Sequence, residues 1–110
     1  MAKSIVLDAG HGGRDNGAVY EDMIEKNDNL RIVLALGQEL ENRGINVYYT
    51  RTTDVFQTPF EKAQIANETN ADAFLSIHRN SGVNPGEYSG VESLVYKKEG
   101  LALEMAENIN

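Results

Sequence analysis

Two histidines and one glutamate are the residues of this chain whose types and positions favour metal chemistry. His11 and His78 are its only histidines, and each lies just beyond the end of a strand-like segment. Because the carboxyl ends of parallel strands share one edge of a sheet, two such strands would aim both imidazoles at one point. A plainer interpretation stays open, in which each histidine ends its strand in contact with solvent.

Glu25 is the carboxylate best placed to join the two histidines. It stands at the start of a predicted helix, and the glycine-rich loop from Gly10 to about Tyr20 would let it fold back over the same sheet edge. Two imidazoles and one carboxylate are a sufficient protein set for a catalytic zinc with an open position. The spacings form no local metal signature, however, and the helix dipole alone favours an acidic residue here.

Composition and loop chemistry exclude several other classes of function. The loop at Gly10–Gly13 has neither the G-x-G-x-x-G spacing nor the Gly-Lys-Ser/Thr ending of a phosphate-binding loop. A formal net charge of -7 argues against binding to nucleic acid or to anionic membranes. The absence of cysteine excludes disulfides and thiolate metal sites. The apolar runs are far shorter than the roughly 20 residues of a membrane span, so no membrane insertion is expected.

Strand-like and helix-like segments alternate along the chain. The predicted strands cover residues 4–8, 46–50, 73–77 and 91–96, and the predicted helices cover residues 25–43, 59–68 and 102–109. This alternation indicates βαβ units. The predicted fold class is therefore α/β, with a mostly parallel twisted sheet and helices on both of its faces.

The ends and faces of the first two helices have local signals. The first helix has Arg43 and Gly44 at its end and an apolar stripe, interrupted by Gly37. The stripe consists of Leu30, Val33, Leu34 and Leu40. The segment Thr58-Pro59-Phe60-Glu61 supplies an N-cap threonine, a proline at the first helical position and a glutamate two residues later, which together predict a capping box.

The pattern stops before a domain of this kind is complete. The chain has 110 residues, enough for one domain at most, and no cap glycine or further strand follows the predicted last helix. We expect residues 1–110 to be the N-terminal part of one domain, truncated before its last strands. Such a part would self-associate or need a further C-terminal segment, because an incomplete sheet leaves an unpaired edge.

Several separated motifs together resemble a known family. In chain order they are Ile5–Gly13, Asp15–Ala18, Glu25–Leu30, Tyr49–Arg51, Ala66–Asn67, Asp72–Ser81 and Gly90–Glu92. These segments resemble the zinc-dependent N-acetylmuramoyl-L-alanine amidases, a family often called amidase type 3. The resemblance covers nearly the whole chain, and this many motifs in the right order are far more specific than any one of them.

The resemblance implies roles for individual residues. His11, Glu25 and His78 are similar to the three zinc ligands of the family. Asn80, beside the third of these, is expected to bind substrate, although an asparagine there also suits a turn.

Two strand-end residues and the catalytic base complete these expectations. Arg51 is expected to be structural, and Asp8 either to orient His11 or simply to end its strand in a turn. The family's catalytic glutamate lies in a later segment resembling V-E-x-G-F, which does not occur before Asn110. Glu104 and Glu107 lie on a predicted helix and do not match it. The resemblance therefore places no catalytic residue in this chain and expects the glutamate beyond Asn110.

The implied activity is hydrolysis of the amide bond between N-acetylmuramic acid and L-alanine in peptidoglycan. An endolysin or autolysin of this kind acts on the bacterial cell wall, in the periplasm or outside the cell. No signal peptide precedes the first strand, so the expected routes are release by a holin or a signal that has been removed. Two alternatives stay open: a catalytically incomplete metal- or wall-binding fragment, and a related zinc peptidase.

Overall fold

The computed structural model describes the backbone of residues 3–81 and 88–97. It describes the side chains of residues 3–78 and those of Ser93 and Val95. Its strands are β1 (Ser4–Ala9), β2 (Val19–Tyr20), β3 (Met23–Ile24), β4 (Asn46–Tyr49), β5 (Ala73–Ser81) and β6 (Tyr88–Lys97). Its helices are α1 (Glu25–Asn42) and α2 (Pro59–Thr69). The helix predicted over residues 102–109 lies outside the described residues.

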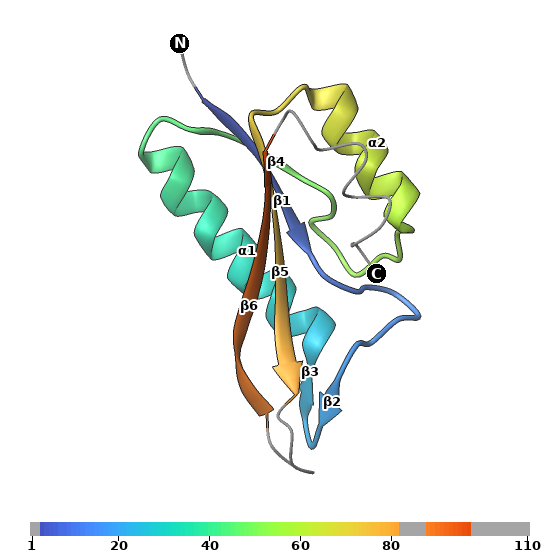
Figure 1. The fold of residues 1–110 in the computed structure, drawn as a ribbon. Coiled ribbons are helices and arrows are strands. Elements are labelled where there is room, and N and C mark those ends of the chain that lie inside the picture. The colour runs from blue at the N-terminus through green and yellow to red at the C-terminus, as the bar shows by residue number, and fades with distance from the viewer. Residues whose placement is uncertain (1–2, 82–87, 98–110) are drawn as a thin grey trace.

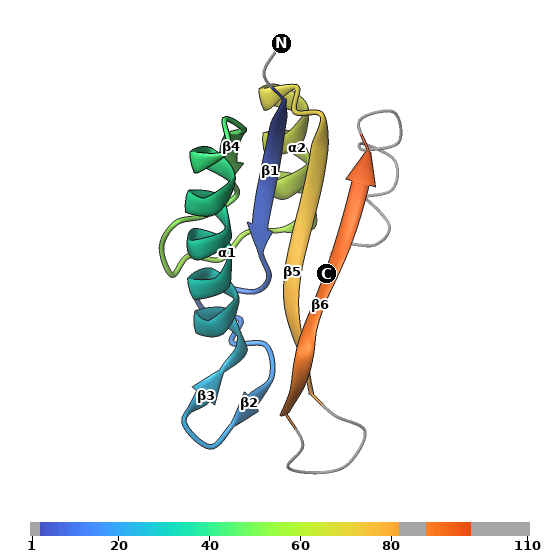
Figure 2. The same ribbon diagram turned by 90° about the vertical axis from the view of Figure 1, so that its left-hand side faces the viewer.

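Four strands form one sheet in the order β4-β1-β5-β6 (Figure 2). Strands β4 and β5 pair in parallel with β1, since α1 and α2 supply the two crossover connections. Strand β6 pairs antiparallel with β5 after residues 82–87, a connection shorter than the dozen or so residues that a parallel crossover needs. The predicted α/β class with a mostly parallel sheet is confirmed.

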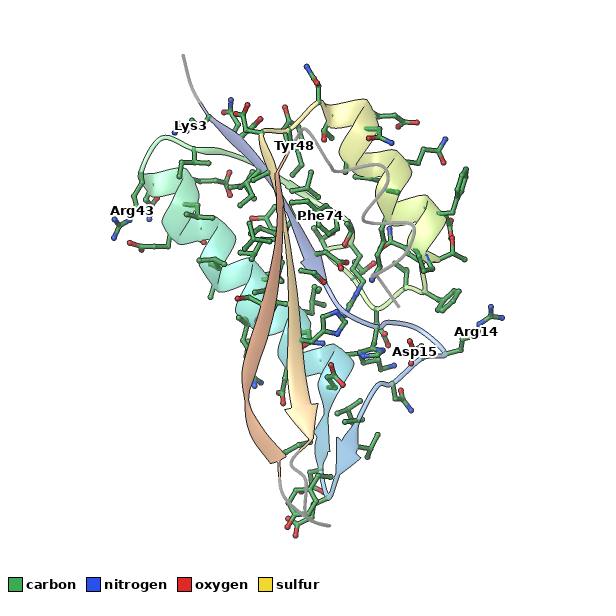
Figure 3. All side chains as sticks on the ribbon, viewed as in Figure 1. Lys3, Arg14, Asp15, Arg43, Tyr48 and Phe74 are labelled. Carbon is green, nitrogen blue, oxygen red and sulfur yellow. The ribbon has the colours of Figure 1, made fainter. Side chains whose placement is uncertain are left out.

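The helices cover opposite faces of this sheet (Figure 1). Because side chains alternate along a strand, each face has its own apolar core. On the α2 face, Phe74 is fully buried beside the helix (Figure 3), in a cluster formed by Val6, Ala63, Ala66, Ala71 and Phe74. On the α1 face, the buried cluster is formed by Leu7, Ala9, Val33 and Ile77.

The packed stripe of α1 differs in part from the predicted one. Leu34 is 40% exposed and its inclusion in the stripe was wrong. Residue 34 is turned about 100° around the helix axis from Val33, which takes it off the face that meets the sheet. Gly37 belongs to that face instead, because a Cβ atom there would overlap the phenol of Tyr49 on β4. The glycine permits close packing of helix on strand rather than interrupting the stripe.

The predicted helix ends are confirmed. At the start of α2 the Thr58 hydroxyl accepts a hydrogen bond from the Glu61 N–H (3.1 Å), and the Glu61 carboxylate accepts one from the Thr58 N–H (2.9 Å). At the end of α1, Arg43 is the C-cap and Gly44 adopts the left-handed conformation with a φ of 84°. Within residues 3–81 and 88–97, no helix is both long and apolar enough to cross a membrane.

A small hairpin was not predicted. Strand β2 lies at the end of the stretch expected to be a loop, and it pairs antiparallel with β3, which leads directly into α1. Figure 2 shows this hairpin below the carboxyl end of β1. Two-residue strands have too little periodicity to be recognised in a sequence, yet this hairpin determines where α1 begins.

Candidate metal centre

His11 is positioned by a tight turn that follows β1. The residue adopts a φ of 66°, and the backbones of Gly12 and Asp15 exchange two hydrogen bonds of 2.8 and 3.0 Å. The turn returns Asp15 to the histidine, so that its carboxylate lies 2.8 Å from His11 Nδ1. Figure 3 shows Asp15 on this loop. With Nδ1 held by Asp15, the other ring nitrogen, Nε2, is left for the site.

Glu25 is positioned by the β2–β3 hairpin. Its N–H donates to the Ala18 carbonyl and its Oε1 accepts from the Ala18 N–H, each at 2.9 Å. The Asn29 amide, one turn further along α1, donates to Glu25 Oε2 (3.3 Å) and to the Gly10 carbonyl (3.0 Å). The carboxylate is therefore buried and held from both sides, with Oε2 directed at the two histidines.

The three predicted ligands come together at the carboxyl edge of the sheet. Glu25 Oε2 lies 3.2 Å from His11 Nε2 and 3.5 Å from His78 Nδ1. The imidazole rings are nearly perpendicular, with centroids 5.2 Å apart. One ligand atom from each residue lies within 4.8 Å of the others. The end of β1 and the start of α1 thus meet β5 at His78. This histidine lies within β5 and not just beyond its end as predicted, because β5 continues to Ser81 in its pairing with β6.

The arrangement fits a zinc ion. Tetrahedral ligands at about 2.0–2.1 Å from zinc lie about 3.3 Å from one another. The distances from Glu25 Oε2 to His11 Nε2 (3.2 Å) and to His78 Nδ1 (3.5 Å) are close to this value. A carboxylate on the distal nitrogen of a metal-binding histidine, as Asp15 provides for His11, is the usual partner in such sites. Glycine keeps the space open, since a Cβ at Gly10 would overlap the His78 ring and one at Gly17 would overlap His11 and Glu25.

The charges of the site favour a cation. Burial by itself raises the pKa of Glu25, but the hydrogen bonds that its carboxylate accepts, the one from His11 foremost, outweigh it and the pKa is lowered. The pKa of His11 is raised above 6.5, chiefly by its hydrogen bond to Glu25, against the effect of burial and with further help from Asp15. A proton on the His11 ring therefore balances the charge of the Glu25 carboxylate when no metal is bound. Protons and a metal ion would compete for the same ligand atoms.

Arg51 secures the loop that carries His11. Its guanidinium is buried, which lowers its pKa, and it donates to four backbone carbonyls at 2.9–3.2 Å. These carbonyls belong to Ala9, Gly10, Lys26 and Thr53. Arg51 therefore ties the end of β1 to the first turn of α1, which agrees with the structural role predicted for it.

Neither role expected for Asp8 is found: it does not orient His11, and it lies within β1 rather than in a turn. Its side chain points to the α2 face, where it meets Thr50, Lys62 and Ser76. Asp15 contacts His11 instead. Residue spacing offered a signal for this, because a Gly-Gly turn can bring a residue four positions later back to the histidine.

Three residues discussed in the sequence have side chains outside the described part of the structure. Asn80 belongs to β5 and pairs with Ser89 of β6, but its side chain is outside the described part. Glu104 and Glu107 also lie outside the described residues. The expectation of a catalytic glutamate beyond Asn110 stays a prediction.

Fold and site together define the class as an α/β protein with two imidazoles and a carboxylate at the carboxyl edge of its sheet, the donor set of catalytic zinc sites. A family profile described as N-acetylmuramoyl-L-alanine amidase matches residues 5–110. The chain belongs to this family.

Relatives and solved structures agree with this membership. The chain is 40% identical over 98 residues to a sporulation-specific N-acetylmuramoyl-L-alanine amidase of Bacillus subtilis, and 40% identical over 99 residues to an endolysin of Bacillus phage SPP1. These alignments cover 87% and 89% of the chain. The catalytic domain of the amidase CwlV from Bacillus (Paenibacillus) polymyxa superposes with a TM-score of 0.71 at 35% identity over 74% of the chain.

The chain spans only part of each relative. It covers 37% of the sporulation amidase, 35% of the endolysin and 48% of the CwlV domain. What these proteins act on is therefore carried over only as a proposal.

Proposed function

We propose that this chain supplies the metal centre of a zinc-dependent hydrolase that cuts the amide bond between N-acetylmuramic acid and L-alanine in peptidoglycan. The observation that carries the proposal is the convergence of His11, Glu25 and His78 on one point in a chain of the amidase family. The proposal places the protein's action at the bacterial cell wall.

Each residue of the centre has a distinct part. His11 Nε2, His78 Nδ1 and Glu25 Oε2 would hold the ion, and their single negative charge would leave the loaded site with a net positive charge. Asp15 holds the His11 ring in place through Nδ1 (2.8 Å). When bound, zinc supplies Lewis-acid chemistry: it polarises an amide carbonyl and lowers the pKa of a coordinated water to about 7.

Proton transfer needs a second carboxylate. Glu25 is committed to the two histidines and to the Ala18 N–H, so it does not serve as the general base in this proposal. The base is assigned to a glutamate beyond Asn110, as the family resemblance implies. Its loss would remove roughly 10²–10⁴-fold of the rate, the usual contribution of a positioned acid or base.

Metal analysis tests the centre. Protein purified without chelator should contain one zinc per chain, and replacing His11, Glu25 and His78 together by alanine should abolish it. Arg43→Ala, an exposed change at the C-cap of α1, is the control and should keep its zinc. Unchanged zinc in the triple variant would refute the assignment of the centre.

Product analysis tests the reaction. The full-length protein should release stem peptides with a free L-alanine amino group from purified peptidoglycan. Cleavage of free peptides without action on the wall would favour a zinc peptidase instead. Zinc binding with no turnover by the full-length protein would favour a metal- or wall-binding role.

A further inference from the structure

A buried polar cluster lies behind the metal centre, on the face of the sheet that α2 covers. Its members are Asp8 on β1, Thr50 just after β4, Lys62 on α2 and Ser76 on β5, and none is more than 5% exposed. Buried charged groups are costly even when paired, and replacing a pair by apolar residues is often neutral for stability. This cluster therefore calls for a reason other than stability.

Within the cluster, Asp8 is the acceptor and its neighbours are the donors. Lys62 Nζ lies 3.0 Å from Asp8 Oδ1 and 3.4 Å from Oδ2, and an ammonium group only donates. An ionised aspartate only accepts, so the Ser76 hydroxyl, 2.7 Å from Asp8 Oδ2, has to donate its single hydrogen to it. If that hydrogen pointed elsewhere, two oxygens would face each other at 2.7 Å with no hydrogen between them.

This direction determines what Ser76 offers to His78. The Ser76 oxygen lies 3.1 Å from His78 Nε2, and with its hydrogen committed to Asp8 it has only lone pairs left for the ring. Nε2 must therefore carry the hydrogen. In a neutral imidazole the other nitrogen is then the acceptor, and Nδ1 is the atom that lies 3.5 Å from Glu25 Oε2.

We propose that Ser76 and Asp8 are positioning residues that fix the tautomer of His78, so that Nδ1 presents its lone pair to the metal. The inference rests on the proposed metal centre. The two histidines then bind through different nitrogens: Asp15 holds Nδ1 of His11, whereas Ser76 holds Nε2 of His78. The Lys62 ammonium pairs with the Asp8 carboxylate (3.0 Å) and thereby links α2 to the centre.

Thr50 and Ser76 offer a matched pair of substitutions. Each hydroxyl donates to one oxygen of Asp8, at 2.8 and 2.7 Å, and both residues are buried. Only Ser76 also contacts His78. Ser76→Ala and Thr50→Val therefore remove equivalent contacts of the buried carboxylate, but only the first removes the partner of the histidine.

Zinc affinity and ring protonation test the proposal. By competition with a chelator, Ser76→Ala should bind zinc about 10–100-fold more weakly, the usual cost of losing such a partner, whereas Thr50→Val should bind it as the parent does. The nitrogen-15 shifts of His78 in the metal-free parent, measured at a pH where the ring carries one proton, should show hydrogen on Nε2. Ser76→Ala should shift that proton partly to Nδ1.

Three outcomes separate the possibilities. Hydrogen on Nδ1 in the parent overturns the inference, and this measurement needs no variant to fold. Equal zinc affinities in the two variants also overturn it, because they would make the cluster merely structural. If the parent binds no zinc, the proposed function fails, while the nitrogen-15 shifts still decide the tautomer.

Discussion

Removing the Arg51 guanidinium is expected to be among the most damaging single changes away from the metal ligands. The side chain is 4% exposed and donates four hydrogen bonds to backbone carbonyls. Arg51→Met keeps most of the apolar stem and deletes all four. A hydrogen bond from a charged group contributes about 1.5–3 kcal/mol, so a simple sum would exceed the total stability of many domains.

The expected loss is smaller than this sum for structural reasons. The Gly10 carbonyl keeps a second donor in Asn29 Nδ2 at 3.0 Å, and four bonds from one planar group are not independent. Breaking one partner out of a buried charged network typically costs about 3–5 kcal/mol, and we expect Arg51→Met to fall in this range. The loop that carries His11 should loosen at the same time.

Urea unfolding in the presence of chelator measures this loss without a contribution from bound metal. Arg43→Met is the control, because that guanidinium is exposed and, among the described residues, pairs only with Glu39 across one helical turn, a contact worth about 0.3–0.5 kcal/mol. A loss of under about 1 kcal/mol for Arg51→Met, the range of an exposed ion pair, would refute the view that Arg51 holds the loop together.

Three further changes probe the site and its scaffold. Asp15→Asn should weaken zinc binding about 10–100-fold in a chelator competition, because the His11 ring loses its charged partner, and an unchanged affinity would count against that role. Thr58→Ala and Glu61→Ala should each lower the free energy of unfolding by about 0.5–2 kcal/mol while zinc content stays at the parent level. In chelator, the stability advantage of the parent over Glu25→Gln should be largest between pH 4.5 and 6.5. The advantage should shrink above pH 6.5 as the raised pKa of His11 is passed, and it should shrink below pH 4.5 as Glu25 is protonated. An advantage that keeps growing above pH 7 in urea titrations would contradict a stabilising hydrogen bond between His11 and Glu25.

Local signals predicted the main elements well. The Thr58–Glu61 capping box and the Arg43–Gly44 ending depend on neighbouring residues alone, so the sequence contains all that is needed to recognise them. The parallel arrangement of β1, β4 and β5 follows from the helices between them. The meeting of His11, Glu25 and His78 was favoured by the position of both histidines near the ends of predicted strands, and the family resemblance assigned all three as ligands.

The errors concern features that depend on backbone conformation or on distant packing. The contact of Asp15 with His11 requires a left-handed φ of 66° at a non-glycine residue, which no periodic pattern reveals. Asp8 turns toward Lys62, a residue of α2, and nothing near position 8 indicates this partner. Leu34 fits an apolar stripe in isolation, and only the contact of Gly37 with Tyr49 shows which face meets the sheet.

The positions of the three ligands along the chain have a consequence for its polymer statistics. His11 and Glu25 are joined by one short hairpin, whereas α1, β4, α2 and the first part of β5 lie between Glu25 and His78. A metal bound by all three would close a loop of about 50 residues, which by the entropy of a cross-linked chain corresponds to about 4 kcal/mol, similar to a disulfide. The chain has no cysteine, so such a metal would be its reversible cross-link between β5 and the start of α1. Removing the metal would raise the conformational entropy of the unfolded chain, and so lower the stability of the fold, as well as disable the site.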